Sequence, residues 1–169
     1  PEVMALTFPS TLPIMKQLLG QGLSAIGSPA VELLLHRYAD AEHKRQVEIA
    51  LLLAEFGKTA STASTILTTA LVNRANQEHA IVLRQAAAIA LGKISNGSDE
   101  VIHALIDVAG RVDEKQSLRS FCIEALMDLG PAAAAATSVL QRILKQDEDE
   151  DLQKFAWAEI GRAACRERV

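Results

Sequence analysis

Apolar residues recur every three or four positions in the stretch LRQAAAIALGKIS, from Leu83 to Ser95. That spacing places Leu83, Leu91 and Ile94, with several alanines, on one face of a helix with 3.6 residues per turn. Alanine is also the best helix former, and its small side chain lets neighbouring helices come close. The stretch therefore predicts a thin helix packed on several sides. Gly92, one turn before its end, is expected to admit a neighbouring backbone.

The same template of apolar, basic and small positions returns in four other stretches. The five copies begin near residues 15, 45, 83, 118 and 152, which are 30 to 38 residues apart. LRSFCIEALMDLG, from Leu118 to Gly130, matches without gaps. The copy at Met15 matches loosely because two glycines interrupt it, and the copy at Leu152 has Glu159 at an apolar place. A period of this length accommodates two helices and two turns.

The second helix of each pair is expected between these copies, at residues 29–39, 60–73, 99–109 and 131–145. Two of these segments begin with proline after Gly or Ser, and a third begins at a carboxylate, Asp99, which are favoured ways to start a helix. No segment has the period-two pattern of a strand. We therefore predict an all-α fold, an α-α superhelix of about four helix pairs plus a partial fifth, in a single domain spanning residues 1–169.

Four features carry a resemblance to a known family: the stretches LRQAAAIALGKIS and LRSFCIEALMDLG, the segment PAAAAATSVLQRILKQDED, and the Ile26-Gly27 and Phe56-Gly57 helix ends. They are similar to the HEAT-repeat superfamily, in particular its short bacterial repeats of the phycobilisome-lyase (PBS) type. Armadillo repeats need a longer period, and the Trp, Gly, Tyr and Pro signature of tetratricopeptide repeats is absent. The resemblance implies a right-handed solenoid whose helix pairs bury their apolar faces against each other.

The two ends of the array depart from the repeat pattern. The fifth copy has a first helix without a second, and residues 1–14 are apolar and broken by three prolines. Because repeat arrays need polar caps, we expect either a fragment of a longer array or ends that pack on a partner or a second copy. Self-assembly of this kind would bury Phe155, Trp157 and the N-terminal apolar segment.

Composition narrows the possible functions. The 169 residues are 49% hydrophobic and only 4% aromatic, and 17 basic against 21 acidic residues give a formal net charge of −4. The mixed signs disfavour nucleic-acid binding, which needs a basic surface, and Tyr38 and Trp157 are too isolated for a DNA glycosylase groove. No apolar run reaches the roughly 18 residues of a membrane span, and no secretion signal is recognisable. We therefore expect a cytoplasmic protein that does not bind membranes.

The titratable residues do not form a recognisable active site. The four histidines fall at dissimilar repeat positions, and no motif pairs two of them on one helix turn. Glu32 lies one turn from His36, and Asp99 and Asp107 each lie one turn from His103. These groups predict surface hydrogen bonds or ion pairs rather than metal sites, because no second histidine or cysteine joins them. We predict no catalytic residue, no metal site and no cofactor.

The cysteines and one acidic run have structural interpretations. Cys122 falls on the buried side of its helix, where a thiol stays protonated and is a poor nucleophile. Cys165 lies in the tail, so a disulfide between the two is not expected. The acidic run at 147–151 (DEDED) lacks the glycine and final glutamate of a calcium-binding EF-hand loop. It predicts a solvated turn whose charges favour the start of the following helix.

The resemblance implies that the second helices line the concave surface of the solenoid. Aligning these helices gives two outward columns, the first of Leu33, Thr68, His103 and Gln141 and the second of Arg37, Val72, Asp107 and Lys145. We expect a protein partner to bind there through Arg37, Thr68, His103, Asp107, Gln141 and Lys145, beside a neutral patch that includes Thr65 and Thr69. The alternative is that these are solvated helix positions without a partner.

The expected function is a non-catalytic protein–protein interaction scaffold. The first alternative is a self-assembling repeat module of a larger protein. The second is an enzyme related to chromophore lyases or to DNA-repair proteins with HEAT-like repeats, but no residue set in the sequence carries either chemistry.

The alanines of the Leu83–Ser95 stretch are expected to set the distance between helix layers. Replacing Ala88 by leucine should overpack this interface and lower the free energy of unfolding by about 1 to 3 kcal/mol. Urea denaturation measures this change. An unchanged unfolding midpoint would contradict close packing at this position.

Overall fold

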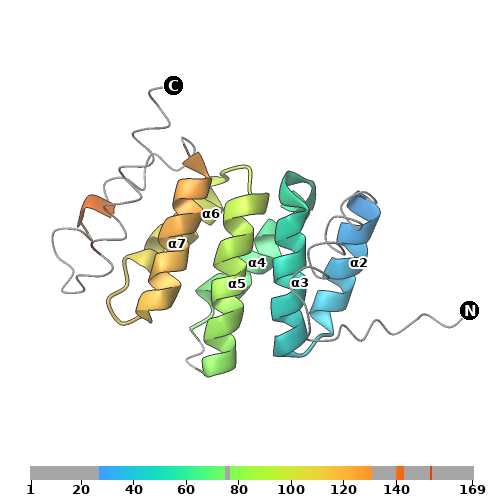
Figure 1. Cartoon of the computed structure of the whole chain (residues 1–169), viewed down its shortest axis with the longest axis horizontal. Helices are drawn as coiled ribbons and strands as arrows, with labels where there is room; N and C mark the ends of the chain where they lie inside the picture. The colour runs from blue at the N-terminus through green and yellow to red at the C-terminus, as the bar shows by residue number, and fades with distance from the viewer. Residues whose placement is uncertain (1–26, 75–76, 131–139, 143–152, 154–169) are drawn as a thin grey trace, which may run out of the picture.

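The protein forms a layered stack of helices in a computed structural model, which describes residues 27–74, 77–130, 140–142 and 153 (Figure 1). The helices are α2 (Ser28–Ala39), α3 (His43–Glu55), the 3-10 helix η1 (Gly57–Ala63), α4 (Ser64–Val72), α5 (Glu78–Ile94), α6 (Asp99–Ala109) and α7 (Gln116–Asp128). The described ranges contain no strand, and the predicted all-α fold is confirmed. Within them, no helix is both long and apolar enough to cross a membrane.

The predicted first and second helices alternate along the chain. The first helices at 45, 83 and 118 are α3, α5 and α7, which lie side by side in one layer (Figure 1). We call these the A helices. We call the second helices α2, α4 and α6 the B helices. In Figure 1, α4 and α6 lie behind the A helices, and α2 lies beside α3 at the end of the stack. The predicted first helix at Met15 lies outside the described residues, as do the helices at 131–145 and 152–164 apart from residues 140–142 and 153.

One predicted second helix has a different shape. The segment expected to be helical from residue 60 begins as the 3-10 helix η1, with a non-helical Ala60, and becomes α-helical only at Ser64. The segment is rich in hydroxyl residues, among them Thr59, Ser61 and Thr62, a residue type that disfavours α-helix because its side chain can compete for backbone hydrogen bonds.

Helix α5 is the centre of the apolar core. Its four alanines at positions 86, 87, 88 and 90 are at most 3% exposed, and α3 and α7 pack on either side of it. Leu53 of α3 and Leu118 of α7 are fully buried in the same cluster. The predicted thin helix is therefore confirmed.

Gly92 is the point of closest approach between α5 and α7. A Cβ atom added at this position would lie 2.8 Å from the Cα atom of Ala125. Real Cβ atoms do not come that close to a backbone atom, so only glycine allows the observed spacing. The predicted role of Gly92 is confirmed.

A polar side chain joins each B helix to the A helix that follows it. The donors occupy the second position of the repeat template, and the acceptors are carbonyls in the last turn of the preceding B helix, which lack partners inside their own helix. The pairs are Gln46 Nε2 to Tyr38 O at 3.2 Å, Arg84 Nε to Leu71 O at 2.8 Å, and Arg119 Nε to Ala109 O at 2.9 Å. We call these three hydrogen bonds the repeat joints.

Arg84 makes a further contact that reaches the next repeat. Its side chain is 1% exposed, and its Nη1 atom donates to Glu114 Oε2 at 2.8 Å in the loop between α6 and α7. Its Nη2 atom donates to the other carboxylate oxygen. The hydrogen bond from Arg84 lowers the pKa of Glu114, against the opposing effect of burial, and Arg111 also contributes. Arg84 therefore connects α4, α5 and the loop before α7.

The substitution Gly92→Ala should change the free energy of unfolding through two effects of opposite sign. Alanine is favoured over glycine inside a helix by about 1 kcal/mol, whereas forcing α5 away from Ala125 should cost about 1 to 3 kcal/mol. We expect a net decrease in the free energy of unfolding, measured by urea denaturation. Lys93→Ala, at the exposed neighbouring position, is the control and should change it by less than about 0.5 kcal/mol. A Gly92→Ala protein as stable as the wild type would contradict the close approach of α5 and α7.

The substitution Glu114→Gln tests whether the ion pair between Arg84 and Glu114 stabilises the fold. The measurement is the free energy of unfolding as a function of pH. The pKa of Glu114 is lowered in the folded state, so its contribution to stability is present above the ordinary carboxyl pKa of 4.5 and is lost as the pH falls through the folded pKa. We expect Glu114→Gln to lose about 1.5 to 3 kcal/mol at neutral pH. As the pH falls below 4.5, the free energy of unfolding of this variant should decrease by less than that of the wild type.

The control for this pH series is Asp113→Asn, which removes an exposed carboxylate from the same loop. Its stability should follow the wild-type pH dependence. Parallel curves for wild type and Glu114→Gln in acid would show that the pair does not stabilise the fold.

Candidate protein-binding surface

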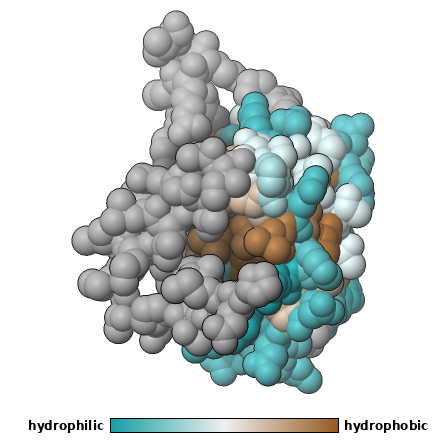
Figure 2. Space-filling view, turned by 90° about the vertical axis from the view of Figure 1, so that its right-hand side faces the viewer, coloured by the Kyte–Doolittle hydropathy of each residue, from teal (hydrophilic) through white to brown (hydrophobic). Residues whose placement is uncertain are grey.

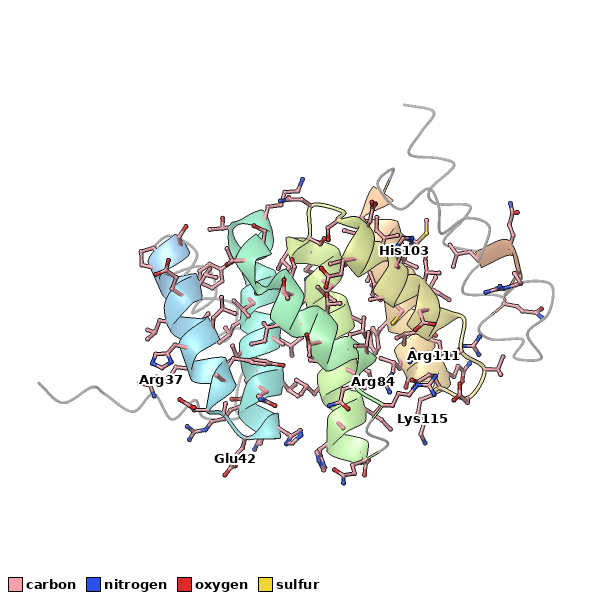
Figure 3. All side chains as sticks on the ribbon, turned by 180° about the vertical axis from the view of Figure 1, so that it is seen from behind. Arg37, Glu42, Arg84, His103, Arg111 and Lys115 are labelled. Carbon is pink, nitrogen blue, oxygen red and sulfur yellow. The ribbon has the colours of Figure 1, made fainter. Side chains whose placement is uncertain are left out.

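The exposed sides of α2, α4 and α6, with the exposed Gln141 and Arg142, form the surface that we call the B-helix face (Figure 3). Helix α6 shows how the sequence builds this face. Val101, Leu105 and Val108 recur at three- and four-residue spacing and are buried, so the helix turns Glu100, His103 and Asp107 to solvent.

His103 and Asp107 are the best-defined of the predicted binding residues. They lie one turn apart on α6, and both are exposed. The carboxylate of Asp107 accepts a hydrogen bond from Nη2 of Arg111, four residues later in the chain. The Asp107 side chain remains 59% exposed in this ion pair, so solvent and salt screen it and it adds little to stability. Asp107 therefore remains accessible to a partner.

The other predicted residues have different placements. Arg37 is exposed in the last turn of α2, on a different helix from His103 and well separated from it (Figure 3). Gln141 is exposed, and Lys145 lies outside the described residues. In the same two columns, Leu33 is 59% and Val72 37% exposed. The described candidates are thus spread along the B-helix face and do not converge on one point.

The prediction that Thr68 points outward is wrong. Thr68 is 6% exposed, and its hydroxyl group donates to the carbonyl of Ser64 at 2.8 Å. The 3-10 segment η1 shifts the start of α4, so that Thr68 faces the core between the buried Leu67 and Leu71. The outward threonines are Thr65 and Thr69.

The polar surface of α4 is neutral. Thr65 and Thr69 are both exposed, and the hydroxyl group of Thr69 donates to the carbonyl of Thr65 at 3.0 Å. The charged residues of the face lie on the helices at either side of α4, such as Arg37 on α2 and Asp107 on α6. The face therefore has an uncharged centre between polar flanks.

The end of the molecule formed by α2 is partly apolar. Figure 2 shows hydrophobic residues gathered there, beside hydrophilic ones. Leu33 is strongly exposed on this helix, while Leu34 and Leu35 are half-buried against the core. Apolar surface of this kind adds hydrophobic contact area next to the polar groups of the B-helix face.

An open groove lies where the A helices end, and sequence reasoning did not find it. Its volume is about 700 Å³, and its lining includes Lys58, Lys93 and Asp128 together with Gly92 and Gly97. The sequence did contain a signal for this groove, because glycine turns follow the A helices. Gly97, for example, has a φ of 76° and donates its N–H to Ser95 Oγ at 3.0 Å. The groove has both signs of charge on its rim.

The described residues offer few reactive groups. Cys122 is fully buried, and burial raises the pKa of its thiol, so it stays protonated as predicted. Within the described ranges, no group of three or more His, Cys, Asp and Glu side chains is arranged to hold a metal ion. The chemistry that the B-helix face supports is hydrogen bonding, ion pairing and apolar contact.

Comparison with known proteins agrees with this architecture. A profile of the HEAT-repeat family (HEAT repeats) matches residues 67–159, which is more than half of the chain. The chain belongs to the HEAT-repeat family. The resemblance seen in the sequence is thereby confirmed, and no curated protein matches the chain.

A solved structure shares the fold of this HEAT-repeat protein. It is the complex of CpcE and CpcF of phycocyanin lyase from Nostoc sp. PCC7120, one chain of which superposes with a TM-score of 0.69. The match covers 89% of this chain and 91% of that chain at 18% sequence identity. At this identity the similarity shows a common fold.

Proposed function

We propose that this HEAT-repeat protein is a non-catalytic scaffold that binds a partner protein on its B-helix face. The main support for the proposal is the row of exposed polar side chains on successive B helices. The opposite side of each of these helices is buried in the apolar core. Groups held on rigid helices lose little conformational freedom on binding, so their hydrogen bonds and ion pairs contribute more of their energy to affinity.

The composition of the face suits a protein surface better than a small molecule. Its candidate groups lie on separate helices, and α4 puts a neutral stretch with Thr65 and Thr69 between the polar residues of α2 and α6. A small ligand needs polar groups that converge in a pocket. An extended partner can instead contact Arg37 and Asp107 at once while packing on the apolar Leu33.

The comparison structure supports the same proposal. It is a complex of two proteins, and its fold is similar to that of this chain. Repeat solenoids present extended surfaces because each helix pair adds one more row of side chains to the same face. We extend to this chain only the idea that such a fold acts together with a partner protein.

The test is a pull-down from lysate of the source organism, followed by affinity measurements with the identified partner. In the double variant His103→Asp and Asp107→Lys, the charge character of α6 is reversed, and affinity should fall at least about tenfold, or 1.4 kcal/mol. The fold should survive, because both side chains are exposed and the Asp107–Arg111 pair contributes at most about 1 kcal/mol.

The control is Glu124→Lys, a charge reversal at an exposed position on α7, in the A layer. It should keep wild-type affinity, and circular dichroism should show the same helix content in all three proteins. Full affinity in the α6 double variant would rule out this face as the binding surface. Capture of a second copy of the chain, with no other protein, would favour self-assembly instead.

A further inference from the structure

The first turns of α3 and α5 bring together two histidines from neighbouring repeats. His43 is the first residue of α3, and His79 follows Glu78 at the start of α5. Their rings meet edge to face, with centroids 4.5 Å apart and planes at 75°. Both side chains are exposed, and neither ring makes a hydrogen bond within the described ranges. Each ring, when neutral, therefore has one unprotonated nitrogen whose lone pair is available.

We propose that His43 and His79 form a binding site for a divalent transition-metal ion, such as Ni²⁺ or Cu²⁺. Neutral imidazole is a preferred ligand of these ions. The site lies on the A helices rather than on the B-helix face, so it is independent of the partner-binding proposal.

The short separation of the rings is what supports a shared ion. A metal lies about 2.1 Å from an imidazole nitrogen and hence about 3.2 Å from the ring centroid, so two imidazoles bound side by side to one ion have centroids about 4.5 to 5.3 Å apart. The observed centroids are 4.5 Å apart, in an edge-to-face contact that does not itself point both nitrogens at one position. Because both side chains are exposed, each ring can turn a nitrogen toward a shared ion while the two rings stay close.

The surroundings predict a modest affinity. The N-termini of α3 and α5 carry partial positive charge, which disfavours a cation. The exposed carboxylates of Glu42 and Glu78, next to the two histidines in the chain, favour a cation. The positive charge of Lys44 disfavours it. No third His, Cys, Asp or Glu completes a metal-binding group in the described ranges, so water fills the other coordination positions.

The experiment is a calorimetric titration of the full chain, without a polyhistidine tag, with Ni²⁺ at about pH 7.5, where most imidazole is neutral. Ni²⁺ is preferred to Cu²⁺ as the probe because it does not oxidise the two cysteines. We expect one ion per chain. His43→Asn and His79→Asn should each weaken binding by more than about tenfold, since even the loss of a group behind a metal ligand costs that much.

His103→Asn is the matched control, because His103 is exposed but has no histidine ring against it in the described ranges. It should bind Ni²⁺ as tightly as the wild type. The ion would also link α3 to α5, so Ni²⁺ should raise the Tm of the wild type and of His103→Asn but not of the other two variants.

Three results would overturn the site. The first is equal Ni²⁺ affinity in wild type, His43→Asn and His79→Asn, which would make the ring contact an aromatic one only. The second is an equal loss in His103→Asn, which would indicate nonspecific binding to surface histidines. The third is a wild-type Tm that Ni²⁺ leaves unchanged, because an ion shared by α3 and α5 must stabilise the fold.

Discussion

The close packing of α5 is the constraint on which the rest of the structure depends. Its buried alanines and Gly92 let α3 and α7 approach from two sides, to the point where an added Cβ would lie 2.8 Å from Ala125. Because α5 stands in the middle of the A layer, its thickness fixes the distance between neighbouring repeats. The same distance separates neighbouring B helices, so it also sets the spacing of the polar groups on the B-helix face.

Apolar packing is not directional, so it leaves the rotation and register of each repeat open. The repeat joints remove that freedom. A buried guanidinium group is costly unless its charge and its N–H groups are matched, and Arg84 satisfies this condition only when Leu71 O and the Glu114 carboxylate are both in place. The described array thus combines alanine layers that set distance with polar joints that set alignment.

Sequence alone predicted the features that depend on local periodicity. The A helices, the buried Cys122 and the role of Gly92 all follow from the spacing of small and apolar residues within one stretch. Thr68 was misplaced because the phase of α4 depends on the preceding 3-10 segment, which no apolar pattern marks. The contact of His43 with His79 was hidden for another reason: the two residues occupy different repeat positions and meet only when α3 and α5 pack.

The repeat joints also change where one structural unit ends and the next begins. A repeat is usually counted as an A helix followed by its B helix, but each joint ties a B helix to the A helix after it. A module exchanged at the B-to-A loops would separate the donor of each joint from its carbonyl acceptor. Exchange at the glycine turns after the A helices would transfer both together, but Arg84 and Glu114 would then come from different modules. A recipient recombined at those turns must therefore offer a carboxylate at the position of Glu114, because Arg84 would otherwise bury an unmatched charge.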